Sequence, residues 1–159
     1  MPVPTSSKPQ SAGLLMYRIV DGEIEVLLGH PGGPFWIRKD EGAWTIPKGL
    51  VASGEEPLAA ARREFAEETG HDPEGEAVPL GSARQAGGKT VHVWAMEGDF
   101  DPADLNSNSF EMEWPPRSGR RQSFPEIDRA AWFRVAEARK KILKGQALFI
   151  DRLLQALRQ

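Results

Sequence analysis

The sequence predicts an α/β fold in which a mixed central sheet lies between two layers of helices. Short apolar stretches typical of strands come before, between and after segments with helical patterning, so we expect a sheet covered on both faces. No internal repeat is visible. A chain of 159 residues suits one domain, since a domain of this length buries about 70% of the surface that its unfolded form exposes.

Composition limits the classes of partner and compartment. The formal net charge of −3 lacks the basic excess that binding to a nucleic-acid polymer requires, whereas a nucleotide is a suitable small-molecule partner. The absence of cysteine excludes disulfides and thiolate metal sites and fits a reducing compartment. No apolar run has the length of a signal peptide or a transmembrane helix. We therefore predict a cytoplasmic protein without membrane contact, either a monomer or a homodimer.

The first part of the chain is expected to form a tail and a β-hairpin. Residues 1–11 are rich in Pro, Ser and Thr, so we predict a disordered tail there and a single domain over 12–159. Ala12–Val20 and Glu23–Leu28 are apolar and flank Asp21-Gly22, a dipeptide that favours a two-residue turn. These two stretches are predicted to pair as antiparallel strands.

Turn residues and patterning predict the remaining elements. A Gly/Pro loop at His30–Pro34 leads to a strand-like stretch at Ala43–Ile46 and then to a helix over Pro57–Thr69, which Gly70 ends. The polar, proline-containing region 99–124 is expected to be mostly loop. The other expected elements are strands at Val78–Gln85, Val91–Met96 and Ala130–Arg134, a short strand at Phe110–Trp114, and two helices over Ala136–Leu157 divided at Gly145.

Three carboxylates share one flank of the expected helix over Pro57–Thr69. Glu64 lies beside both Glu67 and Glu68, because residues three and four apart are neighbours on a helix. The three span an arc of about 100°. Their repulsion becomes attraction when a divalent cation binds, and Mg²⁺ prefers carboxylate oxygens and bridges them to substrate phosphates. The cluster therefore predicts Mg²⁺, with Mn²⁺ as a substitute, and a phosphorylated substrate; a solvated charged face is the alternative for these three residues taken alone.

A longer pattern surrounds these carboxylates. It consists of Gly, five residues, Glu, seven residues, Arg-Glu, an apolar residue, any residue, Glu-Glu, any residue, Gly and a last apolar residue. The chain supplies it with Gly49, Glu55, Arg63, Glu64, Phe65, Glu67, Glu68 and Gly70. Seven fixed matches by chance have odds of about one in a million or less. This pattern is the Nudix box, and from Ser11 onward the sequence resembles the MutT-like Nudix hydrolases, with His71 in the final apolar position as a departure.

The resemblance implies the Nudix fold, an α/β/α sandwich, and hydrolysis of a phosphoanhydride bond in a nucleoside-diphosphate-linked substrate. It implies that Glu64 acts as general base or as a metal ligand close to the attacking water, that Arg63 orients Glu64, and that Glu55 braces the loop. Gly49 and Gly70 are structural members of the motif. The implied metal ligands are Glu64, Glu67, Glu68 and the backbone carbonyl of Lys48, and the catalytic set is Glu64, Arg63, Glu67 and Glu68.

Shorter matches favour one group within the family. Trp44-Thr-Ile-Pro-Lys-Gly49 resembles the diadenosine polyphosphate hydrolases, as does Lys89-Thr-Val followed by Trp94, where the lysine meets a phosphate. Phe124-Pro-Glu126 resembles their segment with an additional metal-site glutamate. The resemblance thus implies substrate contacts at Lys48 and Lys89 and a metal ligand at Glu126. An exposed strand-end lysine is the alternative for Lys89, and a solvated side chain is the alternative for Lys48.

Two aromatic residues are candidates for holding the substrate base. Phe35 and Trp36 lie in a Gly/Pro loop, where binding residues are common, and aromatic rings stack well on purines. A core plug is the alternative for each. Arg117, Arg120 and Arg121 form the densest basic cluster, which we interpret as solvated loop charge, with contact to a long polyphosphate as the alternative.

Three classes of function fit these observations. The leading hypothesis is a hydrolase of nucleoside polyphosphates, with a dinucleoside polyphosphate such as diadenosine tetraphosphate, or a nucleoside triphosphate, as substrate. The same chemistry could act on an oxidised nucleoside triphosphate, a capped RNA end or a nucleotide sugar, because fold and motif do not fix the substrate. A non-catalytic nucleotide sensor on the same scaffold is the third hypothesis.

Overall fold

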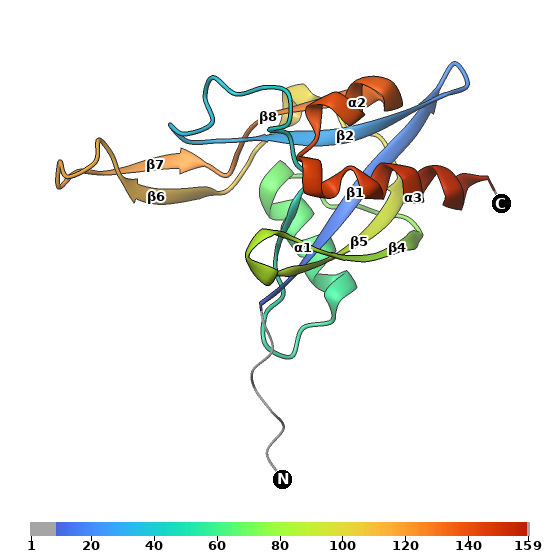
Figure 1. Ribbon diagram of the computed structural model, residues 1–159, viewed down its shortest axis with the longest axis horizontal. Helices are drawn as coiled ribbons and strands as arrows, with labels where there is room; N and C mark the ends of the chain where they lie inside the picture. Colours follow the sequence, from blue (N-terminus) through green and yellow to red (C-terminus); the bar gives the residue numbers. More distant parts are fainter. Residues whose placement is uncertain (1–8, 159) are drawn as a thin grey trace, which may run out of the picture.

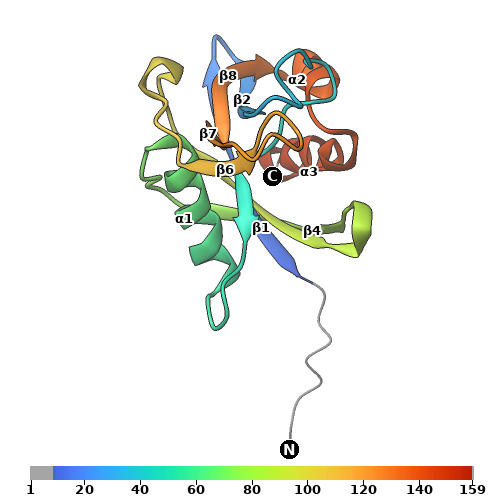
Figure 2. The same ribbon diagram turned by 90° about the vertical axis from the view of Figure 1, so that its left-hand side faces the viewer.

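The computed structural model describes residues 9–158 and confirms an α/β sandwich with a mixed sheet. The sheet runs in the order β4, β5, β1, β2 and β8, and β3 pairs with β1 beside β2. β1 and β5 are parallel, whereas the other neighbouring strands are antiparallel. Helix α1 covers one face, and α2 and α3 lie on the other (Figures 1 and 2).

The strands and helices have the following bounds. The strands are β1 Gln10–Val20, β2 Glu23–Pro31, β3 Lys48–Leu50, β4 Ala77–Arg84, β5 Thr90–Glu97, β6 Ser109–Glu113, β7 Arg121–Pro125 and β8 Ile127–Arg134. The α-helices are α1 Pro57–Thr69, α2 Val135–Lys141 and α3 Leu148–Leu157, with short 3₁₀ turns at η1 Ala86–Gly88, η2 Pro102–Asp104 and η3 Lys144–Gln146. None of the helices within residues 9–158 is long and apolar enough to cross a membrane.

Strand β1 lies at the centre of both hydrophobic cores. Successive side chains of a strand point to opposite faces of the sheet. Leu14 and Met16 therefore pack with Phe65 of α1, whereas Leu15 and Tyr17 pack in the cluster that contains α3. Burial on both faces explains why the sequence of β1 is a nearly continuous apolar run instead of an alternating one.

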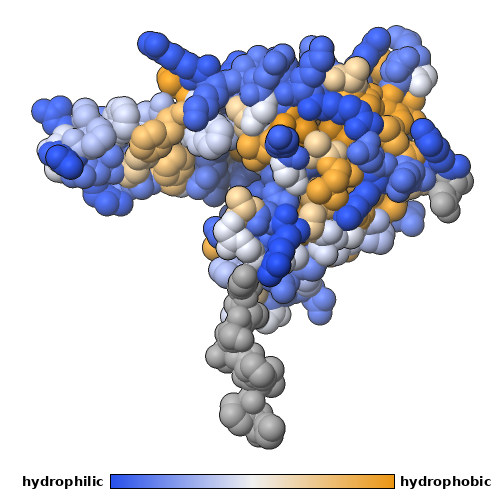
Figure 3. All heavy atoms as spheres, viewed as in Figure 1, coloured by the Kyte–Doolittle hydropathy of each residue, from blue (hydrophilic) through white to orange (hydrophobic). Residues whose placement is uncertain are grey.

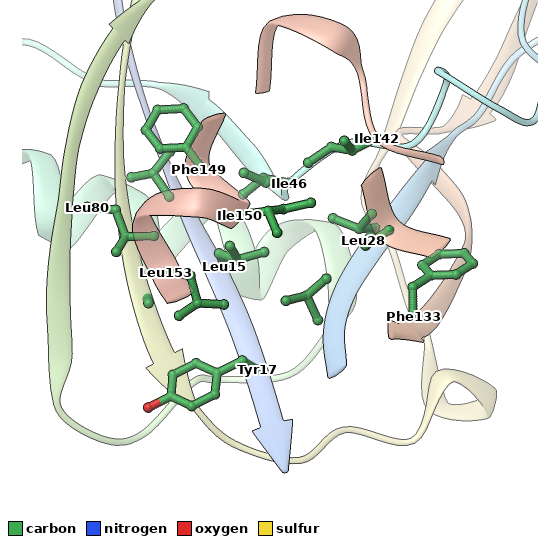
Figure 4. Packing of buried hydrophobic residues seen from close by; sticks show 14 of the residues in the cluster. Leu15, Tyr17, Leu28, Ile46, Leu80, Phe133, Ile142, Phe149, Ile150 and Leu153 are labelled. Carbon is green, nitrogen blue, oxygen red and sulfur yellow. The ribbon is translucent and has the colours of Figure 1, made fainter. Parts of the chain in front are cut away.

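The face opposite α1 is closed by α3. Phe149, Ile150 and Leu153 are fully buried there, and Figure 4 shows Ile150 between Leu15 of β1 and Leu28 of β2, with Phe149 and Leu153 on the side of Leu80. Complete burial of a side chain of this size contributes about 1.5–3 kcal/mol. This apolar layer fixes the last helix, and with it the turn at Lys144–Gln146, against the sheet.

The predicted β1–β2 hairpin and its turn are confirmed. Val20 pairs with Glu23 across Asp21 and Gly22, which have φ angles of 53° and 78°. Positive φ at both central residues is the requirement of a type I′ turn. The expected tail needs a correction, because Gln10 and Ser11 are already part of β1 and pair with Thr90 and Val91. The rest of the predicted tail, residues 1–8, lies outside the described residues.

The stretch at Ala43–Ile46 is not a regular strand. It forms isolated bridges from Thr45 to Gly29 and from Trp44 to Ile142, and the strand that pairs with β1 comes later, at β3. Pro47 interrupts the stretch because it has no N–H to donate. Its carbonyl still accepts a hydrogen bond from the N–H of Leu14, at 3.1 Å.

The expectation of a mostly irregular region over 99–124 is wrong for its second half. β6 and β7 form a hairpin that projects from the body of the protein (Figure 1), and the predicted strand at Phe110–Trp114 corresponds to β6. Figure 3 shows apolar surface on this hairpin between hydrophilic surroundings. The following strand also starts earlier than expected, at Ile127 instead of Ala130, because Ile127 already pairs with Pro31 of β2.

Candidate active site

Helix α1 places the carboxylates of the motif. Pro57 occupies the first turn, and Gly70 ends the helix in the left-handed conformation with φ 79°, donating its N–H to Ala66 at 2.8 Å. A side chain at Gly70 would also meet the backbone of Asn106, so only glycine fits. The helix buries Phe65 completely against the sheet. The flank next to Phe65 therefore presents its glutamates to a hollow beside β3.

Arg63 holds the motif together by donating to five acceptors. It binds both carboxylate oxygens of Glu55, with Nε to Oε2 at 2.8 Å and Nη2 to Oε1 at 3.0 Å. Its Nη1 donates to Glu64 at 2.7 Å and to Glu67 at 3.1 Å, and its Nη2 also donates to the carbonyl of Leu50 at 3.0 Å. A planar guanidinium suits such forked contacts, which lysine could not reproduce.

Glu55 links the loop before α1 to Arg63 by hydrogen bonds. In addition to its contacts with Arg63, it accepts a hydrogen bond from the N–H of Ala52 at 2.9 Å. The hydrogen bonds from Arg63, and then the one from Ala52, lower the pKa of Glu55 to about 2. Glu55 is therefore ionised throughout the physiological pH range, and its carboxylate accepts hydrogen bonds from the loop and from Arg63.

Glu64 lies directly against Gly49 at the start of the motif. A Cβ atom placed on Gly49 would be 1.9 Å from Oε1 of Glu64 and 2.0 Å from its Cδ, far inside van der Waals contact. The φ angle of Gly49 is not in the left-handed region, so close approach and not backbone conformation is the reason for glycine. The glycine of the motif makes room for this carboxylate.

Glu68 is the most buried of the glutamates, with 8% of its surface exposed. Burial raises its pKa to about 8, and the negative charges of Glu64 and Glu126 add to the rise, while Lys48 opposes it. Glu126, which follows β7, is half-buried, and its pKa is also raised, by burial and then by Glu64. Glu64, Glu68 and Glu126 thus repel one another, and a cation would relieve the repulsion.

The four glutamates line one hollow of about 300 Å³. It is bounded by Lys48, Gly49, Leu50, Glu64, Glu67, Glu68, Asn108 and Glu126. Helix α1, strand β3 and the base of the β6–β7 hairpin therefore contribute to one site. Glu67 lies at its rim and is the most exposed of the three helical carboxylates, and it also accepts a hydrogen bond from Arg63.

The backbone of Lys48 is turned toward the same hollow. Its N–H is close enough to the carboxylate of Glu68 to lower the pKa of that group. The N–H and the carbonyl of one strand residue point to the same edge, while those of the next residue point to the other. Since the preceding carbonyl, that of Pro47, bonds to β1, the Lys48 carbonyl faces the Glu68 side.

This donor set fits a magnesium ion. It offers four carboxylates and a backbone carbonyl, all of them hard oxygen ligands. In the arrangement found among residues 9–158, no group of three or more acidic or histidine side chains is positioned to hold a metal ion. A half-open set agrees with the preference of Mg²⁺ for retaining several water molecules and binding substrate phosphates.

The structure separates the two aromatic candidates. Trp36 lines a cavity of about 220 Å³ that it shares with Lys48, Glu68 and Glu126, so it lies beside the carboxylates. Phe35 is 61% exposed and contacts Trp114 of the hairpin edge-on, with ring centroids 5.4 Å apart. Trp36 is therefore placed to contact a substrate, whereas Phe35 is placed on the hairpin side.

A third cavity, of about 460 Å³, contains Lys89. It also contains Lys48, which borders both this cavity and the carboxylate hollow. Asn108 and Lys144 line these two spaces without having been singled out in the sequence. Asn108 is a polar residue in a polar segment, and Lys144 follows the helix α2, so neither carried a sequence signal.

A larger cavity of about 780 Å³ lies elsewhere, between the segment 37–44 and β8. None of the four glutamates lines it. Its charged groups are largely paired with each other, since Asp40 binds Lys141, and Asp128 lies 2.8 Å from the ring of His30 and 3.8 Å from Arg129. Size alone therefore does not identify the reactive site, and the chemistry of the donors favours the smaller hollow.

A carboxylate hollow next to lysines, on an α/β/α sandwich, is the kind of site expected in proteins that handle phosphorylated ligands with a divalent cation. Comparison with known proteins gives the family. A family model described as NUDIX domain matches residues 9–153, and the chain therefore belongs to the Nudix hydrolase family.

Individual relatives agree with this assignment. An RNA pyrophosphohydrolase from Roseobacter denitrificans is 39% identical over 74 residues, a match that covers 42% of each protein. The structure of a C. elegans Ap4A hydrolase binary complex superposes with a TM-score of 0.67 and 23% identity, covering 93% of this chain and 98% of that one. The NUDIX domain of Shewanella oneidensis NrtR, in complex with ADP ribose, gives a TM-score of 0.67 at 17% identity and covers 98% and 94%. At these identities the two structures support the fold.

Proposed function

We propose that this protein is a Mg²⁺-dependent pyrophosphohydrolase of nucleoside polyphosphates, with a dinucleoside polyphosphate such as diadenosine tetraphosphate as the favoured substrate. The observation that carries the proposal is the single hollow in which Glu64, Glu67, Glu68 and Glu126 converge beside Lys48. The match to the Nudix family and the C. elegans Ap4A hydrolase neighbour support it. A cytoplasmic location and a monomeric or homodimeric state stay predictions from the sequence.

The residues of the hollow divide into two roles. Glu64, Glu67, Glu68, Glu126 and the carbonyl of Lys48 would hold Mg²⁺, or Mn²⁺ in its place. When bound, the cation would neutralise the charge of the phosphates and lower the pKa of the water molecule bound to it. Lys48 and Lys89 would bind phosphate oxygens, and Trp36 would contact the base, a role for which Phe35 is less well placed.

Glu64 would accept the proton of the attacking water. Arg63 binds its Oε2 at 2.7 Å and fixes the orientation of the carboxylate. Oε1 accepts no hydrogen bond from the described side chains and is left to receive the proton. As this proton moves, hydroxide attacks phosphorus and a nucleotide leaves. Catalysis is then mainly a matter of position and charge.

A hydrolysis screen with Mg²⁺ or Mn²⁺ tests the proposal. The compounds are diadenosine tetra-, penta- and hexaphosphate, nucleoside triphosphates, oxidised dGTP, ADP-ribose and an RNA with a 5′-triphosphate, with products separated by chromatography. We expect ATP from the dinucleotides and at least a 100-fold lower turnover for Glu64→Gln. Glu76→Gln, an exposed glutamate away from the hollow, is the matched control and should keep full activity.

Each other outcome has a definite meaning. Preferred cleavage of the RNA end, the type of substrate named for the R. denitrificans relative, or of oxidised dGTP would keep the chemistry and overturn the choice of substrate. Full turnover by Glu64→Gln would refute the site. Tight nucleotide binding without cleavage would favour a nucleotide sensor.

A further inference from the structure

We infer that Lys144 and Lys89, together with Lys48, form a polyphosphate-binding site that holds the phosphates extending beyond the carboxylate hollow. The inference rests on the proposed function and specifies its substrate as a nucleotide with three or more linked phosphates. Lys144 belongs to no motif of the sequence, and its assignment comes from its place in the fold, on the turn η3 between α2 and α3.

The site is the cavity of about 460 Å³ in which three separate segments meet. Lys48 comes from β3, Lys89 from the residue before β5, and Lys144 from η3. No Asp or Glu is among the residues that line it. None of the three lysines takes part in an ion pair between described residues. A cleft lined by charges of one sign concentrates ligands of the opposite sign, so this cavity favours a polyanion.

Hydrogen bonds fasten the segments that carry the lysines. Gln85 donates its side-chain amide to the carbonyl of Gly145 at 3.0 Å, and its backbone N–H to the carbonyl of Lys89 at 2.6 Å. The turn that carries Lys89 and the turn that carries Lys144 are thus tied together by Gln85. Segments held in advance lose less backbone conformational entropy when the ligand arrives.

A second fastening connects η3 to the segment that precedes Lys48. Gln146 is 1% exposed, accepts a hydrogen bond from the N–H of Ile46 at 2.9 Å, and donates to the hydroxyl of Thr45 at 3.1 Å. Displacing a buried carboxamide whose oxygen and nitrogen both form hydrogen bonds is costly, because both groups would lose their partners. The position of Lys144 relative to Lys48 is therefore set by the core of the protein.

Lys48 connects this cavity to the carboxylate hollow, because it lines both. A phosphate chain with its reacting phosphorus at Glu64 therefore reaches Lys89 and Lys144 when it continues past Lys48. We expect a short chain of two phosphates to end before that point. Lys144 should thus discriminate between long and short phosphate chains, whereas the glutamates serve both.

Binding of inorganic phosphates tests the site without any need for turnover. Glu64→Gln is present in every variant to prevent hydrolysis, and calorimetry with Mg²⁺ compares inorganic tripolyphosphate with pyrophosphate. We expect Lys144→Ala to weaken tripolyphosphate binding about 10-fold and pyrophosphate binding less than 2-fold. Lys140→Ala removes an exposed lysine that lies outside the cavity and should change neither. Lys144→Arg should retain most of the affinity.

If Lys144→Ala weakened the binding of both phosphates equally, the inference would be overturned, because the effect would be structural. If Lys140→Ala weakened tripolyphosphate binding as much as Lys144→Ala, it would also be overturned, because the effect would be one of general charge.

Kinetics of the Lys144→Ala protein with an intact Glu64 separate this inference from the proposed function. A KM about 10-fold higher for diadenosine tetraphosphate, with kcat within 2-fold, supports both. Normal kinetics and normal tripolyphosphate binding overturn the lysine site alone. Tripolyphosphate binding that depends on Lys144, in a protein that cleaves no nucleotide, supports the site and overturns the hydrolase.

Discussion

Replacing Gly49 by alanine should abolish most of the activity and leave the fold intact. The new Cβ would lie 1.9 Å from Oε1 and 2.0 Å from Cδ of Glu64, whereas ordinary contact begins at 3.4 Å. The carboxylate must therefore move by about 1.5 Å, a shift that also breaks its 2.7 Å hydrogen bond from Arg63. Since a displacement of about 1 Å at a reacting group costs on the order of 100-fold in rate, we expect kcat to fall at least about 100-fold.

Stability should respond differently. The atom that must yield is at the end of a flexible side chain, and alanine is compatible with the backbone of Gly49, whose φ is not positive. We expect the free energy of unfolding to change by less than about 1 kcal/mol. Gly54 is the matched control, because its φ is 77° and no atom lies within 4 Å of the position that a Cβ would take there. Gly54→Ala should cost about 1–2 kcal/mol of stability through backbone strain and keep full turnover.

Two assays decide the matter. Turnover of diadenosine tetraphosphate with Mg²⁺, at a temperature where all variants are folded, gives kcat, and urea unfolding gives the free energy of unfolding. Normal turnover by Gly49→Ala would show that Glu64 does not act from the position found against Gly49. An equal loss of turnover in Gly54→Ala would show that the loop tolerates no glycine replacement, and the steric argument would fail.

The other predictions concern the same helix and its loop. Glu68→Gln replaces a buried carboxyl group whose ionised form is disfavoured by burial and by the charges of Glu64 and Glu126, so without metal the free energy of unfolding should stay equal or rise, while the increase in Tm on adding Mg²⁺ disappears. Calorimetry with and without Mg²⁺ checks this, and an unchanged Mg²⁺ response would contradict it. Phe65→Ala opens a cavity at a side chain with 0% exposure and should lower the free energy of unfolding by about 3–5 kcal/mol in urea, whereas a loss under about 1 kcal/mol would mean that the helix faces are misassigned. The pKa of Glu55 is lowered from its ordinary value of 4.5 to about 2, so its ion pair stabilises the fold above pH 4.5 and loses that effect as the pH falls toward 2. The stability difference between the wild type and Glu55→Gln, measured at several pH values, should therefore shrink below pH 4.5, and a difference that stays constant down to pH 3 would refute the pairing.

Local signals in the sequence predicted most of the fold. Asp21-Gly22 defined a turn whose positive φ angles few other dipeptides accept, and Pro57 and Gly70 marked the ends of α1 correctly. The strand β7 escaped detection because its first residues, Arg121-Gln-Ser, are polar. It pairs with β6 in a two-stranded sheet with little burial, so no alternation of apolar residues was required.

The candidate site was predictable where its residues are close in sequence. The spacing of Glu64, Glu67 and Glu68 brings them together on any α-helix. Their unequal burial was not predictable, because it depends on β3 and on the hairpin base, which pack against the helix from other parts of the chain. Lys144 gave no signal, since its approach to Lys48 is a property of the tertiary fold.

The base of the β6–β7 hairpin has a consequence for evolution and for engineering. Two backbone hydrogen bonds tie it to the rest of the protein, from Asn108 to Glu67 at 2.8 Å and from Gly32 to Glu126 at 2.9 Å, and a third, from Glu126 to Asn108 at 2.9 Å, closes the base itself. None of these involves the tip between β6 and β7. The tip can therefore lengthen, shorten or carry an inserted peptide or fluorophore while Glu126 keeps its place, which makes this arm a natural position for variation between relatives and for a reporter group.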